Sequence, residues 1–360
     1  MRLIPSPFAA ALLGSLALLT FAAIAPAVAQ DGPYKVLATT KVGGPGGMDY
    51  VYADSDARRL YIARSGPEGH VGVFNLDTLA QVGDITKTSA HGATTDTKYG
   101  TGLAASKPVT FFNAKTLAVI KTLDVQGNPD GYLTDTFNDR FYILSHAAPN
   151  VSVIDAKDGT ILGTIDLGGA PEQAVTDGKG HIYIDIEDKD AIAVIDARTM
   201  KMTGKYDISS RGGGCAGLAM DVKNDILFAS CRDKKNMIIL SAKDGKIITD
   251  LPIGNGSDGA TFNPATMEAF SSQGDGTLTV IKENSPTSFV VEQTVKTPVR
   301  AKTLTLDAKT GKIFLIAAEY GPAPAAPAPV AGAVAPPAGQ YRGGRAPMIP
   351  DSFMIVTVGK

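Results

Sequence analysis

The chain has 360 residues with 34 basic and 36 acidic side chains, so its formal net charge is only −2. A nearly neutral chain lacks the electrostatic signature of general nucleic-acid binding. The 39 Gly residues, together with the many Val, Ile and Tyr residues, favour short strands joined by tight turns.

The first residues predict a secretory signal peptide. Arg2 is the only charged residue before Asp31, and an apolar run extends from Phe8 to Ile24. Ala27-Val28-Ala29 then matches the small-x-small pattern of a signal-peptidase site. We therefore expect residues 1–29 to be removed and the chain to be periplasmic or secreted, with an uncleaved membrane anchor as the alternative. The apolar run is short for a membrane span, and no later segment offers one.

A repeat of about forty residues organises the remaining chain, 30–360. In each unit an apolar strand ends in Asp or Asn, and a polar turn, a second apolar strand and a third strand follow. The marking residues are spaced by 39 to 44 positions, and they are Asp54, Asp96, Asp135, Asp177, Asp221, Asn263 and Asp307. We interpret their side chains as turn caps that accept hydrogen bonds from nearby backbone N–H groups.

The third unit shows all four strands of the repeat. They are predicted at 131–136, 140–145, 151–155 and 161–167, with the hairpin turn Asp158-Gly159 before the last. Four strands at this period are typical of a propeller blade, whose faces are buried only against neighbouring blades. No stretch has sustained helical periodicity. The sequence therefore predicts an all-β, seven-bladed β-propeller of four-stranded blades.

The two ends of the chain are expected to close the ring. The last unit offers three strands, at 303–306, 312–317 and 353–358. The strand predicted from Tyr34 to Val42 belongs to no unit. We therefore expect this N-terminal strand to join the last blade as its outer strand.

One segment of the last unit departs from the repeat. Residues 321–350 are dominated by Ala, Pro and Gly, with Arg342 and Arg345 near the end. Such a composition buries too little apolar area to fold alone. We interpret it as a flexible insertion within the last blade, serving as a solvated spacer or, alternatively, as a partner-binding segment.

Two repeat strands carry a family resemblance. They read Val-Ser-Val-Ile-Asp-Ala from Val151 and Ile-Ala-Val-Ile-Asp-Ala from Ile192, and Gly168-Gly169-Ala170-Pro171 links their units. With these motifs the chain resembles the YVTN/YncE-like family of bacterial propeller proteins. The resemblance covers nearly the whole chain after the signal peptide and implies the fold and export. It implies no activity, because similar propellers include lactone hydrolases, a lyase acting on cyclic peptides and surface-layer proteins.

A ring of polar residues is expected at the mouth of the central channel, where propellers usually place ligands. Five positions before each marking residue, the units carry Asp49, His91, Asp130, Glu172, Ala216, Asp258 and Lys302. Equivalent positions in a ring converge on its axis. Converging carboxylates repel one another, and this repulsion raises pKa values or recruits a cation.

This ring is the candidate ligand-binding site. We expect a small ligand to contact Asp49, His91, Asp130, Glu172, Asp258 and Lys302. A divalent metal is the candidate cofactor, with Asp49, His91 and Asp130 as its ligands. Carboxylates with one imidazole suit Ca²⁺, Mn²⁺ or Mg²⁺ better than structural Zn²⁺. A solvated ring of ion pairs is the alternative, and no catalytic residue is assigned.

Cys215 and Cys231 are the only cysteines. They are equidistant from a hairpin turn centred near Lys223, so they should face each other on paired strands. In an oxidising compartment this favours a disulfide, with two free thiols or a metal pair as alternatives.

The remaining histidines and two arginines lie outside the predicted ring. His70, His146 and His181 fall at blade loops or strand starts and are predicted to be surface residues. Arg211 and Arg232 flank the mouth of the fifth blade and are candidates for contacting an anionic ligand.

Three function classes remain open. We favour an exported ligand-binding or scaffold propeller, which we expect to be a monomer with a small molecule or a protein as its partner. The alternatives are a metal-assisted lactonase or lyase acting at the same mouth, and a protein–protein interaction module. The sequence has no serine nucleophile elbow, HExxH motif or CxxCH haem-attachment motif.

Overall fold

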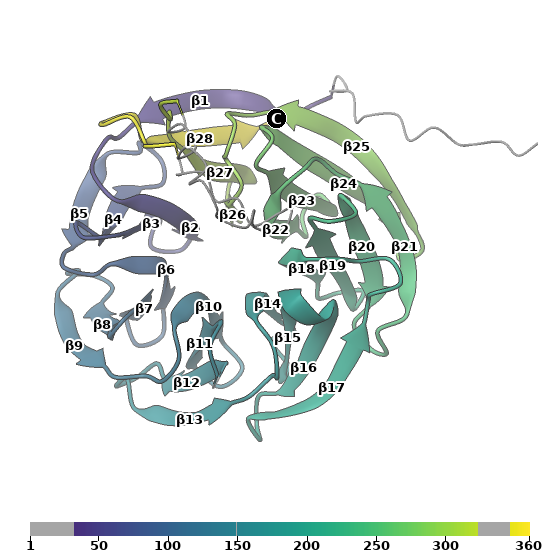
Figure 1. Cartoon of the computed structure of the whole chain (residues 1–360), viewed down its shortest axis with the longest axis horizontal. Helices are drawn as coiled ribbons and strands as arrows, with labels where there is room; N and C mark the ends of the chain where they lie inside the picture. Colours follow the sequence, from purple (N-terminus) through teal and green to yellow (C-terminus); the bar gives the residue numbers. More distant parts are fainter. Residues whose placement is uncertain (1–31, 149, 323–345) are drawn as a thin grey trace, which may run out of the picture.

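The computed structural model describes residues 32–148, 150–322 and 346–360, which form seven four-stranded antiparallel sheets in a ring (Figure 1). This arrangement confirms the predicted all-β, seven-bladed propeller. Among the described residues, the single helical element is a 3-10 turn at Glu187–Lys189, and no helix there has the length and apolarity needed to cross a membrane.

In six blades the strands follow chain order from the channel outward, and in the seventh β26, β27 and β28 are followed by β1 as the outer strand (Figure 1). Blade 1 contains β2 (Gly47–Asp54), β3 (Arg59–Ser65), β4 (His70–Asn75) and β5 (Gln81–Ile85). Blade 2 contains β6 (Ala90–Asp96), β7 (Thr101–Ser106), β8 (Val109–Asn113) and β9 (Val119–Leu123). Blade 3 contains β10 (Pro129–Asp135), β11 (Arg140–Ser145), β12 (Val151–Asp155) and β13 (Ile161–Ile165).

The other four blades repeat this order. Blade 4 contains β14 (Pro171–Thr176), β15 (His181–Ile186), β16 (Ala191–Asp196) and β17 (Lys201–Asp207). Blade 5 contains β18 (Cys215–Asp221), β19 (Ile226–Cys231), β20 (Asn236–Ser241) and β21 (Ile247–Pro252). Blade 6 contains β22 (Ser257–Asn263), β23 (Glu268–Gln273), β24 (Thr277–Ser285) and β25 (Ser288–Lys296). Blade 7 contains β26 (Leu304–Asp307), β27 (Lys312–Ala317), β28 (Met354–Gly359) and β1 (Lys35–Lys41).

Apolar side chains fill the spaces between neighbouring blades. Within the described residues there are seven core clusters, and each joins the strands of two adjacent blades. Between blades 3 and 4, for example, Tyr142 and Val153 pack with Ile182 and Ile184, all fully buried. Full burial of one aliphatic side chain contributes about 1.5–3 kcal/mol, so the blades stabilise one another rather than folding as separate units.

The two ends of the chain meet in blade 7, as predicted. β1 pairs antiparallel with β28 and forms the outer strand of that sheet. Tyr34 packs edge-on against Phe270 of blade 6, with 5.2 Å between ring centroids. Lys360 Nζ lies 2.9 Å from Glu268 Oε1, so the last residue of the chain is also tied to blade 6.

The predicted insertion at 321–350 lies between β27 and β28. Most of it, including Arg342 and Arg345, falls outside the described residues, as does the predicted signal peptide at 1–29. Its two flanks approach each other, because Gly321 N donates a hydrogen bond to Pro347 O at 2.9 Å. The segment therefore leaves and rejoins blade 7 at one place.

The Asp and Asn residues that mark the repeat cap the turns, which confirms their structural interpretation. Asp54 Oδ1 accepts hydrogen bonds from the backbone N–H groups of Asp56 and Ala57 at 3.1 and 2.8 Å. The other six marking residues accept equivalent backbone bonds. Several also link blades, and the guanidinium of Arg58 in blade 1 donates two 2.8 Å hydrogen bonds to Asp307 of blade 7.

The Arg58–Asp307 pair gives a test of ring closure. Burial of Asp307 acts to raise its pKa, but hydrogen bonds from Arg58 and Thr310 lower that pKa to about 2. We predict that Asp307→Asn lowers the free energy of unfolding by about 2 kcal/mol near neutral pH. Because the folded-state pKa lies below the unfolded value, this contribution is present above about pH 5 and is lost as the pH falls toward about 2.

Denaturant unfolding of the wild type and Asp307→Asn at several pH values measures this difference. A gap in unfolding free energy that stayed constant from neutral pH to about pH 3 would contradict the assignment.

Candidate functional site

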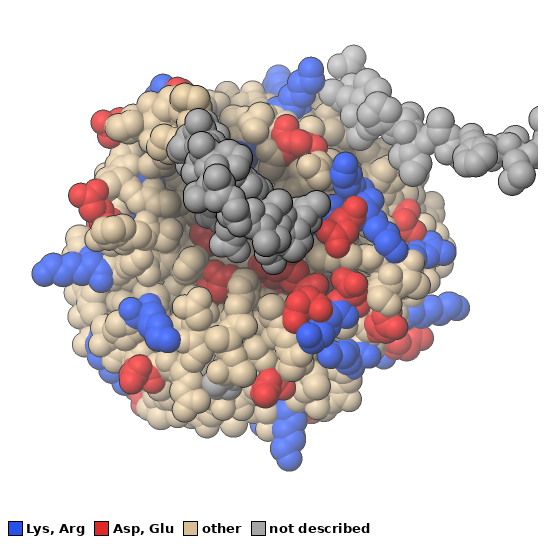
Figure 2. Space-filling model, viewed as in Figure 1, with Lys and Arg blue, Asp and Glu red and all other residues tan. Residues whose placement is uncertain are grey.

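The predicted ring residues lie together at one mouth of the channel. In six blades the ring residue sits at an irregularity in the pairing of the inner strand with its neighbour. A bulge turns a side chain out of the regular alternation of a strand, and here it allows side chains from different blades to converge. Lys302 lies just before β26. Figure 2 shows Asp and Glu side chains gathered around the central hollow.

Mouth side chains of blades 1 to 4 contact one another in series. His91 Nδ1 lies 2.7 Å from Asp49 Oδ2 and 3.1 Å from Asp130 Oδ1. His146 Nε2 lies 3.2 Å from Asp130 Oδ2 and 3.4 Å from Glu172 Oε1. The two carboxylate oxygens of Asp130 therefore face two different imidazoles.

Basic side chains occupy the other side of the mouth. Arg232 forms ion pairs with Glu187 and Asp258, and Lys302 also pairs with Asp258. Arg232 Nη2 is 3.8 Å from Glu172, a much longer contact. The basic groups thus neutralise carboxylates of blades 4 and 6, while the carboxylates of blades 1 to 4 face imidazoles.

His146, Glu187 and Arg232 share one repeat position that sequence reasoning did not use. Each directly follows the second strand of its blade, in blades 3, 4 and 5 respectively. They lie ten or eleven positions after the marking residues of their blades and form part of a second ring. His146 was predicted to be a surface residue; its side chain is 40% exposed, and it also contacts Asp130 and Glu172.

The other predicted residues divide between the mouth and more remote positions. Arg232 occupies the mouth, as the sequence indicated, but the expectation for Arg211 is wrong, because its guanidinium pairs with Asp250 of outer strand β21 at 2.7 Å. His70 and His181 contact carboxylates within their own blades. Ala216, the apolar member of the predicted ring, is fully buried.

The contacts shift the protonation of the mouth. The hydrogen bond with Asp49 raises the pKa of His91, and the hydrogen bond with Glu172 raises the pKa of His146 to about 9. Burial, followed by the charge of Asp49, raises the pKa of Asp130 to about 6. His146 is therefore protonated at neutral pH and offsets part of the negative charge.

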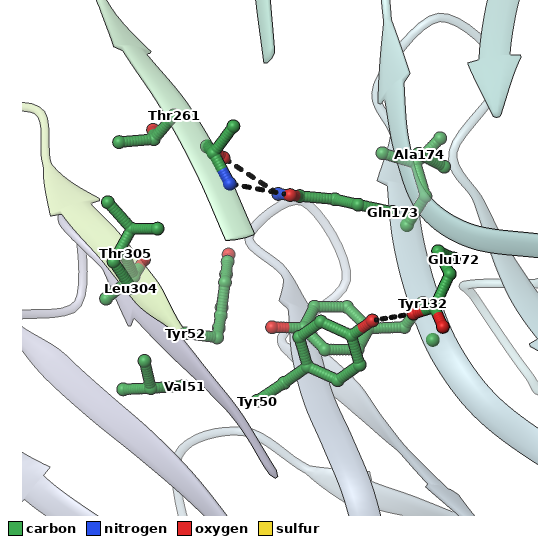
Figure 3. A pocket seen from close by; sticks show the side chains of 13 residues that line it. Tyr50, Val51, Tyr52, Tyr132, Glu172, Gln173, Ala174, Thr261, Leu304 and Thr305 are labelled. Carbon is green, nitrogen blue, oxygen red and sulfur yellow. Dashed lines mark hydrogen bonds between the residues drawn. The ribbon is translucent and has the colours of Figure 1, made fainter. Parts of the chain in front are cut away.

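The pKa values of Glu172 and Glu187 shift in opposite directions. Burial acts to raise the pKa of Glu172, but hydrogen bonds from His146 and Glu187 and the charge of Arg232 lower it to about 2. Burial and the hydrogen bond to Glu172 raise the pKa of Glu187 to about 7. From across the channel, the Tyr50 hydroxyl donates to Glu172 Oε2 at 3.1 Å (Figure 3). Burial keeps the pKa of Tyr50 well above its usual value, so the phenol remains a donor.

A cavity of about 200 Å³ adjoins the mouth inside the channel (Figure 3). Tyr50 and Tyr132 line it and pack edge-to-face with 5.9 Å between ring centroids. Gly92 permits this packing, because a Cβ atom there would lie 2.2 Å from Cε1 of Tyr132. The glycine that follows His91 thus makes room for an aromatic wall beside the mouth.

Gln173 fixes another wall of this cavity. Its Oε1 accepts hydrogen bonds from the backbone N–H groups of Leu218 and Ala260, both at 3.0 Å. Its Nε2 donates to Ala260 O at 2.9 Å (Figure 3). One side chain of blade 4 therefore ties the inner strands of blades 5 and 6 together across the channel.

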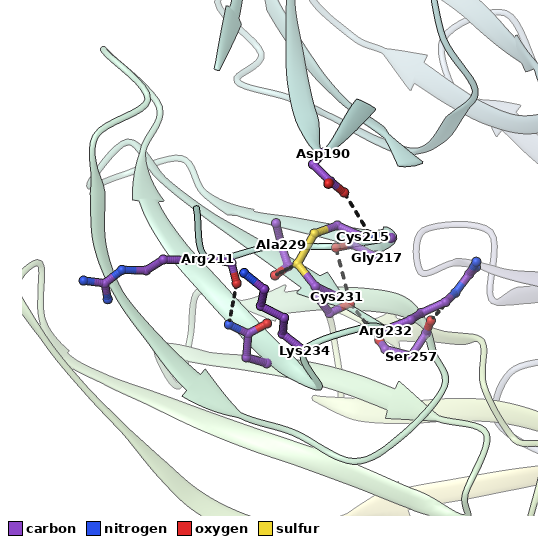
Figure 4. Close-up of a disulfide and its surroundings, with 12 residues drawn as sticks. Asp190, Arg211, Cys215, Gly217, Ala229, Cys231, Arg232, Lys234 and Ser257 are labelled. Atoms are coloured by element: carbon purple, nitrogen blue, oxygen red, sulfur yellow. Dashed lines mark hydrogen bonds between the residues drawn. A yellow bond between two sulfur atoms is a disulfide. The ribbon is translucent and has the colours of Figure 1, made fainter. Parts of the chain in front are cut away.

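A disulfide lies at the mouth end of blade 5. Cys215 and Cys231 occupy directly opposite positions on β18 and β19, and their sulfur atoms are bonded (Figure 4). Cys231 immediately precedes Arg232, and Gly214 N donates to Asp190 Oδ1 at 3.0 Å. The crosslink therefore holds the strand ends from which Arg232 projects.

We predict that replacing both cysteines by Ser lowers the unfolding free energy by about 3 kcal/mol, the value typical for a closed loop of this length. Reductant should shift the denaturation midpoint of the wild type toward that of the variant, without changing the variant itself. Alkylation followed by intact-mass analysis supplies a second readout. Two alkylatable thiols in the unreduced wild type would refute the bridge.

Comparison with known proteins establishes the fold alone. No protein-family model matches the chain, and no curated protein matches its sequence. Among 1671 matching chains of solved structures, one comes from a structure described as "Crystal Structure of Mitotic Checkpoint Complex". It is 12% identical, with a TM-score of 0.67 over 83% of this chain and 95% of that chain. The chain is thus a seven-bladed propeller, a fold that serves ligand-binding and interaction scaffolds in general.

Proposed function

We propose that this protein is an exported, ligand-binding propeller that holds a divalent metal ion at the mouth of its central channel. One observation carries the proposal. Asp49, His91 and Asp130 form one set of potential ligands, and Asp130, His146 and Glu172 form another. Within each set the ligand atoms all lie within 4.8 Å of one another.

The spacing of these atoms suits a cation. Neighbouring ligands on an ion with bonds of about 2.1 Å lie about 3 Å apart. The nitrogen–oxygen separations around His91 and His146 range from 2.7 to 3.4 Å. The same side chains can therefore converge on an ion with small movements once the imidazoles have lost their protons.

The second imidazole changes the preferred metal. The predicted ring, with His91 alone, favoured Ca²⁺, Mn²⁺ or Mg²⁺. His146 gives the other set an imidazole as well, and imidazole favours first-row transition ions over Ca²⁺ and Mg²⁺. Mn²⁺ also accepts carboxylates readily, so it is the ion we propose to test first.

The adjoining cavity supplies room for an organic ligand next to the metal. Tyr50 and Tyr132 offer it aromatic surface, and Glu172 and Gln173 offer it polar atoms. A small pocket with convergent polar groups is the usual form of a ligand site. The second candidate, a metal-assisted lactonase or lyase, uses the same space, because a substrate bound there would lie beside the ion.

Export is supported by two separate features of the chain. Residues 1–29 have the pattern of a cleavable signal peptide. The Cys215–Cys231 disulfide suits an oxidising compartment. The resemblance of the repeat strands to the YVTN/YncE-like family agrees with both, and we propose that the chain is a relative of that family.

We predict that Mn²⁺ raises the thermal unfolding midpoint of the chelator-treated protein, because an ion that binds only the folded state stabilises it by mass action. At an ion concentration about a hundred times the Kd, the gain in unfolding free energy is about 2.7 kcal/mol. The double variant Asp49→Ala, His91→Ala should lose the part of this gain that the Asp49–His91–Asp130 set supplies, whereas His181→Ala, remote from the mouth, should keep the whole gain. Equal shifts in all three proteins would place the ion elsewhere.

Export is tested by expressing the full chain in a bacterial host and fractionating the cells. We predict that the mature protein is in the periplasm or medium and begins at Gln30. A version lacking residues 2–29 should stay in the cytoplasm. Recovery of an intact Met1 in the membrane fraction would instead show an uncleaved anchor.

A further inference from the structure

Among the described carboxylates at the mouth, Asp130 is the one that contacts both imidazoles. Its Oδ1 lies 3.1 Å from His91 and its Oδ2 lies 3.2 Å from His146. It thus belongs to both sets of potential metal ligands, with one oxygen in each. Its side chain is only 15% exposed, so the carboxylate is held between the two sets rather than extended into solvent.

We infer that the mouth binds two divalent transition-metal ions side by side, bridged by the carboxylate of Asp130. Asp49 and His91 complete the first site, and His146 and Glu172 complete the second. Ions bridged in this way lie about 3.5–4 Å apart. This inference rests on the proposed function, because it specifies how many ions the mouth holds and how they are arranged.

The geometry around each imidazole also suits an ion. His91 Nδ1 faces oxygens of both Asp49 and Asp130, and His146 Nε2 faces oxygens of both Asp130 and Glu172. A proton on one nitrogen makes one well-aligned hydrogen bond, and a second acceptor must share it at a poorer angle. A cation at the point where the three atoms converge bonds all of them. This pattern occurs twice, once at each end of the Asp130 carboxylate.

The charge at the mouth points the same way. The groups in contact there are five carboxylates and two basic side chains, namely Asp49, Asp130, Glu172, Glu187, Asp258, Arg232 and Lys302. With neutral imidazoles, these groups leave a formal surplus of three negative charges. The basic groups pair with Glu187 and Asp258. The surplus therefore falls on Asp49, Asp130 and Glu172, the three carboxylates of the two proposed sites.

The number of bound ions tests the inference and separates it from the proposed function. After chelation, the full-length mature protein is titrated with Mn²⁺, and bound metal is measured by calorimetry and by elemental analysis after gel filtration. We expect two ions per chain. One ion would overturn the bridged pair while preserving a metal-binding mouth, and none would overturn both.

Electron paramagnetic resonance of the wild type tests adjacency without any substitution. Two Mn²⁺ ions that share a carboxylate couple magnetically, so the six-line signal of an isolated ion should broaden and weaken as the second site fills. A signal that simply doubles in intensity would show two distant ions and would overturn the bridge.

Single substitutions then assign the two sites. His91→Ala and His146→Ala should each reduce the bound metal from two ions to one and restore the isolated signal. Asp130→Asn should weaken both sites, whereas His181→Ala, whose imidazole also pairs with an aspartate at 2.8 Å, should retain two ions. Circular dichroism checks that each variant is folded. Unchanged stoichiometry in the folded His146→Ala protein would remove the second site.

Discussion

Burial of each blade against its two neighbours is the constraint on which this structure depends. A four-stranded sheet has two apolar faces, and the seven core clusters show that each face is covered only by the next blade. An open row of blades would leave one face bare at each end. The pairing of β1 with β28 prevents this, because it completes the seventh blade and presses it against the first and the sixth.

The channel and its mouth follow from the same constraint. Closing seven blades brings seven inner strands to one axis, so any polar residue at one repeat position meets its equivalents. Small residues make this approach possible. A Cβ atom on Gly217 would lie 2.6 Å from the carbonyl carbon of Gly259, so the inner strands of blades 5 and 6 come together only where side chains are absent. Asp258, the ring residue before Gly259, lies at the strand irregularity and pairs with Arg232 and Lys302 at the mouth.

The nearly constant period of the repeat made two things predictable from the sequence, the fold and those residues of the site that lie on inner strands. Asp49, His91 and Asp130 share a register position, and register is preserved wherever strand lengths are constant. His146 and Glu187 escaped because they follow the second strand and lie eleven and ten positions after the marking residues Asp135 and Asp177, so they share no fixed spacing with them. Arg211 was misinterpreted because it follows the outer strand β17 and pairs with Asp250. Contacts that cross the channel, such as Tyr50 with Glu172, have no sequence signature at all.

The distribution of charge around the mouth gives the site its character. Arg232 and Lys302 could have been placed among the carboxylates of blades 1 to 3, where they would have neutralised them permanently. Instead they pair with Glu187 and Asp258. The remaining carboxylates are balanced by imidazoles, whose charge is a removable proton. A guanidinium cannot yield its nitrogen to a metal, whereas an imidazole can exchange its proton for one. The cations of Arg232 and Lys302 are therefore permanent on one side of the mouth. On the other side, a metal ion can replace the protons of His91 and His146.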